Sequence, residues 1–152
     1  MAEKTENKGI VIPKNDIVKL SGALGEVLYG EMTAEGAMQL MKATVSLQKA
    51  SDDVDKEQKS IINGFRTDEY KELSEKVNSK KATESEKERF EELNRVAVPK
   101  SNEMLEKLYG EVVEFNFKLL SEDDFAKLRE ANKSKITNGG FVTIYKYLCQ
   151  KD

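Results

Sequence analysis

Apolar residues recur every seven positions in the longest helical pattern of the sequence, which runs from Thr33 to about Asn63. The recurring residues are Leu40, Leu47, Val54 and Ile61, with Ala43 and Ala50 three positions after the first two. This spacing puts them on one narrow stripe of an α-helix, as in antiparallel hairpins and coiled coils. The stripe becomes polar at Glu57 and Gln58, so we expect the far end of the helix to project into solvent or to meet a partner.

A second and shorter helix is predicted after Asn63-Gly64, which is a helix stop. Thr67-Asp68-Glu69 is typical of a helix start, because a hydroxyl can cap the helix and the carboxylates favour its positive end. The apolar face of this helix, at Tyr70, Leu73 and Val77, is modest.

A return helix is predicted from Thr83-Glu84-Ser85-Glu86, where a carboxylate three residues after a hydroxyl forms the pattern of a capping box. Pro99 should either kink this helix or take the first position of a further helix that reaches Tyr109. We therefore expect a long antiparallel helical hairpin over residues 33–109 with a charged tip near 66–84.

Two segments on either side of the hairpin have the composition and spacing of short strands. Gly9-Ile10-Val11-Ile12-Pro13 is a β-branched run stopped by proline, and residues 112–117 alternate apolar and polar side chains. We expect these segments to pair. The fold class is then mostly α with α+β character, in which the hairpin stands beside a small two-stranded antiparallel sheet and short flanking helices.

Three flanking helices are expected. The first should be capped by Asn15 or Asp16, and we interpret Gly22 and Gly25 within it as sites of close packing. The second starts at Ser121 and ends near 131. The third covers 141–148, where a strand is the alternative because Val, Thr, Ile and Tyr favour strands. The organisation is then a flexible arm at 1–8 and a single helix-rich domain at 9–152.

The chain contains no histidine, which removes Ser-His and Cys-His nucleophilic pairs and imidazole metal sites. Its single cysteine, Cys149, has no such partner, and we interpret it as a small filler residue. No carboxylate is set apart from the solvated acidic and basic residues around it. We therefore expect no enzyme activity, no catalytic or metal-binding residues and no cofactor.

The charge balance argues against a nucleic-acid partner, since 28 acidic and 25 basic residues leave a net charge of −3. Two short patterns resemble ligand motifs and then fail. Asp53, Asp55 and Glu57 alternate as in a calcium loop, but the required glycine and final glutamate are absent. Residues 138–143 echo an RNA-recognition strand, but its leading base and first stacking aromatic are missing, and Ile144 replaces its final aromatic. No apolar run approaches the roughly 18 residues that span a membrane, so we expect no membrane partner.

Protein binding is the role that remains, through a partner protein or a second copy of the chain. Methionines supply adaptable apolar contact, although in this setting they more commonly fill a core. The acidic run of the return helix could cover a basic surface. The residues predicted to contact a partner are Met38, Met41, Leu47, Val54, Glu84, Glu88, Glu91 and Glu92. Replacing Leu47 or Val54 with Asp should unfold the protein or split an oligomer.

The layout resembles that of a group of uncharacterised small helical proteins of tailed bacteriophages, encoded near tail and lysis genes. The shared features are the apolar segment 10–28, the charged hairpin 33–109, the strand at Gly110-Glu111-Val112-Val113-Glu114-Phe115 and the helix start at Leu120-Ser121-Glu122-Asp123-Asp124-Phe125. Pro99 and the turn at 139–140 depart from that layout. The resemblance implies an accessory protein located in the cytoplasm of the host bacterium or built into the virion.

Three hypotheses follow, in order of preference. The first is a non-enzymatic virion structural or assembly component that self-associates or docks on a virion protein. The second is an inhibitor that binds a host defence enzyme through its acidic surface. The third is an enzyme that uses carboxylates alone, for which the sequence contains no positive sign.

Overall fold

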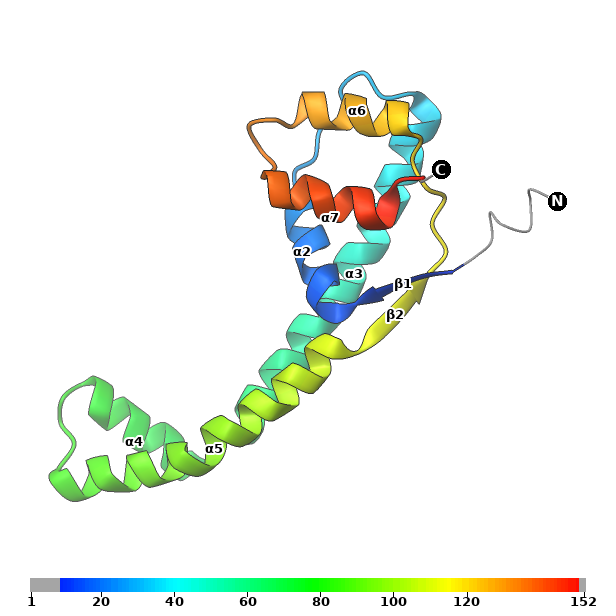
Figure 1. Ribbon diagram of the computed structural model, residues 1–152. Helices are drawn as coiled ribbons and strands as arrows, with labels where there is room; N and C mark the ends of the chain where they lie inside the picture. Colours follow the sequence, from blue (N-terminus) through cyan, green and yellow to red (C-terminus); the bar gives the residue numbers. More distant parts are fainter. Residues whose placement is uncertain (1–8, 151–152) are drawn as a thin grey trace. The chain divides into compact units, whose positions relative to one another are not determined.

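The computed structural model describes residues 9–150, in which six helices and two strands follow one another along the chain (Figure 1). The elements are β1 (Ile10–Pro13), α2 (Lys14–Leu24), α3 (Ala34–Gly64), α4 (Asp68–Asn78), α5 (Glu84–Gly110), β2 (Val112–Phe115), α6 (Glu122–Ala131) and α7 (Asn138–Leu148). The predicted class, mostly α with a small antiparallel sheet, is confirmed. The predicted arm at 1–8 lies outside the described residues.

The sheet joins the two segments whose alternation predicted strands. β1 and β2 pair antiparallel, with Ile10 opposite Phe115 and Ile12 opposite Val113. The pairing continues past β1, because the backbone N–H of Lys14 donates to the carbonyl of Glu111 at 2.8 Å. β2 ends at Phe115, earlier than predicted, and the ring of Phe117 stacks on that of Phe115 with 4.9 Å between centroids.

The chain divides into two compact units. The first holds the described residues up to Val54 and those from Gly110 onward, and the second is Asp55–Tyr109. The single domain expected over 9–152 stays a prediction. Helix α3 contributes residues to both units, because the division falls between Val54 and Asp55 within the helix.

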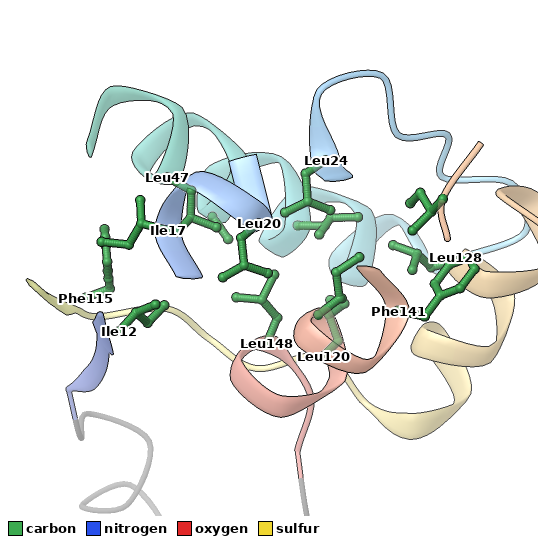
Figure 2. Packing of buried hydrophobic residues seen from close by; sticks show 14 of the residues in the cluster. Ile12, Ile17, Leu20, Leu24, Leu47, Phe115, Leu120, Leu128, Phe141 and Leu148 are labelled. Atoms are coloured by element: carbon green, nitrogen blue, oxygen red, sulfur yellow. The ribbon is translucent and has the colours of Figure 1, made fainter. Parts of the chain in front are cut away.

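A hydrophobic core fills the first unit and draws on every element in it. Figure 2 shows side chains from α2, α3, α6, α7 and the strands converging. Ile17 and Leu20 of α2, Leu47 of α3, Leu128 of α6 and Ile144 of α7 have no exposed surface. Residues 138–148 form helix α7, so the helical interpretation is confirmed and the strand alternative for 141–147 was wrong.

The start of α2 differs from the prediction. The helix begins at Lys14 directly after Pro13, and no side chain caps it. Asn15 and Asp16 lie within the first turn instead of capping it, because the β1 pairing through Lys14 puts the N-cap at Pro13, two and three residues before them. Gly22 is also not a close-packing site, since a Cβ placed there would meet nothing within 4 Å.

The second unit contains α4, α5 and the end of α3. The Tyr109 hydroxyl of α5 donates to Gln58 Oε1 of α3 at 2.9 Å, and farther along both helices Ile62 of α3 and Ser101 of α5 line one hollow. These contacts establish the antiparallel direction expected for the hairpin. Helix α5 continues through Pro99, so the alternative of a new helix at this residue was wrong.

Hydrogen-bonded caps set the starts of α4 and α5, as the sequence predicted. Thr67 Oγ1 accepts from the backbone N–H of Tyr70 at 3.1 Å. At the start of α5, Thr83 and Glu86 each accept from the other's backbone N–H, at 3.2 and 3.0 Å respectively. The capping box is therefore confirmed atom by atom.

Candidate protein-binding surface

Helix α3 has two apolar faces in the first unit, and only one of them is covered. Gly36, Leu40, Ala43 and Leu47 are buried and point to the core. Met38, Met41 and Val45 lie about half a turn away at 3.6 residues per turn, with 52%, 38% and 60% of their surface exposed. We call these three residues, with the exposed Ala34 one turn before them, the α3 stripe.

The structure places the predicted partner-binding residues of α3 on two different faces. Met38 and Met41 are on the surface, as a partner contact requires, whereas Met32 is buried. Leu47 and Val54 were predicted to contact a partner, but the protein itself buries them to 0% and 1% exposure. The seven-residue repeat that suggested them is the core-facing stripe of α3. Val45 was missed, although its spacing from Met38 and Met41 was a readable signal.

The N-terminus of α3 is held by a carboxylate from another helix. Asp124 of α6 is 6% exposed. It accepts from the backbone N–H of Thr33 at 2.8 Å and from the Thr33 hydroxyl at 2.9 Å. Thr33 in turn accepts from the backbone N–H of Gly36 at 3.0 Å. This network anchors the end of the helix next to the α3 stripe, since buried donors are left without water as a substitute partner.

Asn132 performs the matching task for the chain that leads into α3. Its side chain is fully buried and makes three hydrogen bonds: it accepts from Leu28 N–H at 2.9 Å and donates to the carbonyls of Leu28 and Leu128 at 2.8 and 2.7 Å. The segment before α3 is thereby joined to α6 through the backbone at Leu28. No pattern in the sequence indicates this role, because Leu28 is 104 residues from Asn132 along the chain.

The predicted acidic residues are all exposed on α5 in the second unit. Glu84, Glu88 and Glu91 follow one another at spacings of four and three, which places them on one face, and Glu92 lies beside it. Arg89 interrupts the acidic surface. It donates to both carboxylate oxygens of Glu69 at 3.0 and 3.1 Å and to Glu92 at 3.1 Å. Glu92 is therefore partly neutralised, and so is Glu84, which pairs with Lys87 at 3.5 Å. Glu88 and Glu91 form no ion pair within the described residues, so this face keeps a net acidic character.

The ion pairs between α4 and α5 change the pKa values of their members. A hydrogen bond from Lys76 at 2.6 Å, followed by one from the Thr83 backbone N–H, lowers the pKa of Glu86 to about 2. The hydrogen bond from Arg89 lowers the pKa of Glu69. In both cases a donor favours the charged carboxylate. These pairs join α4 to α5.

Surface hollows lie on the second unit. One has a volume of about 670 Å³ and lies along α4, with Arg66, Tyr70, Lys71 and Glu75 among its lining residues. A smaller one of about 180 Å³ is lined by apolar residues such as Ile62, Phe65 and Val98. In the part of the chain that the structure describes, no three His, Cys, Asp or Glu residues are grouped so that they could hold a metal ion.

In the first unit, the Tyr147 phenol has a strongly shifted pKa, and its role is structural. The Tyr147 hydroxyl of α7 donates to Asp16 of α2, and burial together with this carboxylate raises the pKa of Tyr147 to about 12. The phenol is therefore a fixed donor that joins two core helices. Among residues 9–150 there is also no helix with the length and hydrophobicity needed to cross a bilayer.

Known protein families, curated proteins and solved structures provide three comparisons for this chain. None of the three comparisons gives a match for this chain.

Proposed function

We propose that the protein has no enzymatic activity and acts by binding another protein through the α3 stripe. The observation that carries this proposal is the exposure of Met38, Met41 and Val45 on the face of α3 opposite the core. Apolar side chains gathered on one exposed face mark interaction sites, whereas singly scattered ones need no explanation. Methionine suits such a surface because its flexible thioether adapts to a partner.

The biological setting follows from the resemblance in layout to small proteins of tailed bacteriophages. We propose a phage accessory protein that serves as a virion structural or assembly component. Its location is then the cytoplasm of the host bacterium during assembly, and the virion where the protein remains in the particle. The rigid attachment of α3 through Asp124 and Thr33 supports a docking role, since a pre-ordered surface loses less entropy on binding.

A second candidate function uses the acidic face of α5. Glu84, Glu88 and Glu91 form an acidic face on α5, which suits a basic partner such as the nucleic-acid site of a host defence enzyme. The interleaved Lys87 and Arg89 reduce the charge of this surface, so we rank the inhibitor role second.

Affinity capture with matched variants tests the proposal and separates the two candidates. Tagged wild-type protein is incubated with lysates of infected and uninfected bacteria, beside a Met38→Lys/Val45→Lys variant. Val142→Lys is the control, because Val142 is 68% exposed on α7 and lies outside the α3 stripe. A Glu84→Gln/Glu88→Gln/Glu91→Gln variant tests the acidic face.

We expect wild type and Val142→Lys to recover a portal, tail or capsid protein and the stripe variant to lose it. Recovery of one stoichiometric host enzyme that depends on the acidic face would establish the inhibitor role instead. If the stripe variant captures the same proteins as wild type, the α3 stripe is not the binding surface and the proposal fails.

A further inference from the structure

We infer that the α3 stripe binds the α3 stripe of a second copy of this chain, with the two helices antiparallel across a twofold axis. The inference rests on the proposed protein-binding role and names the first partner of the surface. The pair of copies is then the form that engages a virion protein, through surfaces other than the two paired stripes, and a stripe variant loses that protein because it loses the pairing.

The spacing of the α3 stripe is that of a coiled-coil seam. Ala34, Met38, Met41 and Val45 are separated by four, three and four residues, so they occupy alternating a and d positions of a heptad repeat. In an antiparallel pair, a and d positions of opposite chains share a layer. One register places Met38 opposite Met41 and Ala34 opposite Val45 of the second copy, so that all four apolar residues of each copy are covered.

The charges beside the stripe fit the same register. Glu35 and Lys42 are exposed on one flank of the stripe, and neither forms an ion pair within residues 9–150. When Met38 lies opposite Met41 of the other helix, Glu35 of each copy lies next to Lys42 of the other. The twofold axis makes this contact twice. Flanking charges of this kind set the orientation of coiled coils.

The opposite flank carries no charge into the seam. Its residues, Ala37 and Thr44, have small side chains and are half-buried, and Ala37 packs against the core of its own copy. A parallel pair would place Ala37 near Lys42 of the second copy and Thr44 near Lys49, with no opposite charges in contact. The stripe therefore fits itself in the antiparallel direction and not in the parallel one. Beyond Val45 the seam turns polar at Gln48 and Asp52, which limits its length.

Sedimentation equilibrium of the full chain tests this pairing by measuring mass against concentration. The wild-type mass should rise from 17.2 kDa toward twice that value as concentration increases. Glu35→Lys and Lys42→Glu alone should each weaken association about tenfold, because both ion pairs become repulsive. An equimolar mixture of these two variants should regain association, since opposite charges then meet across the two chains. The Glu35→Lys/Lys42→Glu double variant should also associate.

Two controls keep folding and binding apart. Circular dichroism melting shows whether each variant is folded, and Val142→Lys, outside the α3 stripe, should associate like wild type. The inference is overturned if wild type is monomeric throughout, or if the single variants associate as wild type does, or if mixing them restores nothing. A monomer that still captures a virion protein through the stripe overturns only this inference, whereas a charge-dependent dimer that captures none overturns only the virion role.

Discussion

Asp124 of α6 lies directly against Gly36 of α3, and together these two residues show how single residues hold the α3 stripe in place. The carboxylate accepts from Thr33 while resting where a Cβ of residue 36 would be. Glycine is therefore required at 36 by space and not by backbone conformation. This requirement opposes the normal helical preference for alanine, which is about 1 kcal/mol.

The first prediction compares these two effects, the lack of space at residue 36 and the helical preference for alanine. Gly36→Ala should lower the free energy of unfolding by about 1–3 kcal/mol, because the new methyl group displaces Asp124 from Thr33. Gly22→Ala is the matched control: its Cβ meets nothing within 4 Å, so it should raise stability by up to about 1 kcal/mol. Urea denaturation measures both. Equal effects of the same sign at 22 and 36 would contradict the role given to Asp124.

The second prediction concerns acid. The pKa of Glu86 falls from its ordinary 4.5 to about 2 on folding, so its contribution to stability is complete above 4.5 and is lost as the pH falls toward 2. Glu86→Gln should remove this part of the pH dependence of the melting temperature of the second unit. Glu88→Gln, on the exposed acidic face, is the control. A Glu86→Gln variant with the acid profile of wild type would show that the Lys76 pair contributes nothing.

At the scale of elements, α3 shows what sequence reasoning can separate and what it cannot. The seven-residue repeat predicted the helix and its buried stripe correctly, because spacing alone determines which residues share a face. The repeat could not show whether Leu47 faces the chain's own core or another molecule, because a protein core and a protein–protein interface both favour apolar residues at this spacing. The roles of Asp124 and Asn132 were out of reach for a related reason: their partners Thr33 and Leu28 are 91 and 104 residues away.

The two faces of α3 give the third prediction. Leu47→Ala should lower the free energy of unfolding by about 2–5 kcal/mol, because it leaves a cavity in the core of the first unit. Val45→Ala, two residues away on the α3 stripe, should change it by no more than about 0.5 kcal/mol. Chemical denaturation at a concentration where the protein is monomeric provides the measurement. Comparable losses at 45 and 47 would mean that the stripe is covered within the chain.

The fourth prediction concerns Pro99 in helix α5. Pro99 lies inside the helix and cannot donate to the carbonyl of Arg95. Pro99→Ala restores this bond and should raise stability by about 1–3 kcal/mol, after the greater freedom of the unfolded alanine chain is subtracted. Lys100→Ala, at an exposed neighbouring position, should be close to neutral. A loss of stability in Pro99→Ala would show that the interrupted hydrogen bond is needed by the packing of α5.

At the scale of the whole molecule, burial is shared unequally. The first unit contains the extended core, whereas Leu73 and Leu108 are the buried apolar residues of the second among those the structure describes. Local stability follows buried apolar contact. Amide hydrogen exchange should therefore be faster in α4 than in α2 and α7, and Leu73→Ala should accelerate α4 while leaving α7 unchanged. Uniform protection across all helices would contradict this difference between the units.

The backbone hydrogen bonds between Leu120 and the segment Leu148–Gln150 affect the order in which the first unit can assemble during synthesis. The Leu120 N–H donates to the Leu148 carbonyl and the Gln150 N–H donates to the Leu120 carbonyl, both at 2.7 Å, while α7 packs on α2 near the other end of the chain. During synthesis, α2 therefore cannot pack against α7 until residues through Gln150 have left the ribosome. Residues 55–109 are contiguous and can fold earlier, although domains usually form from the N-terminus onward. The apolar surface of α2 is therefore made early and covered late, so it stays exposed to chaperones during most of the synthesis of the chain.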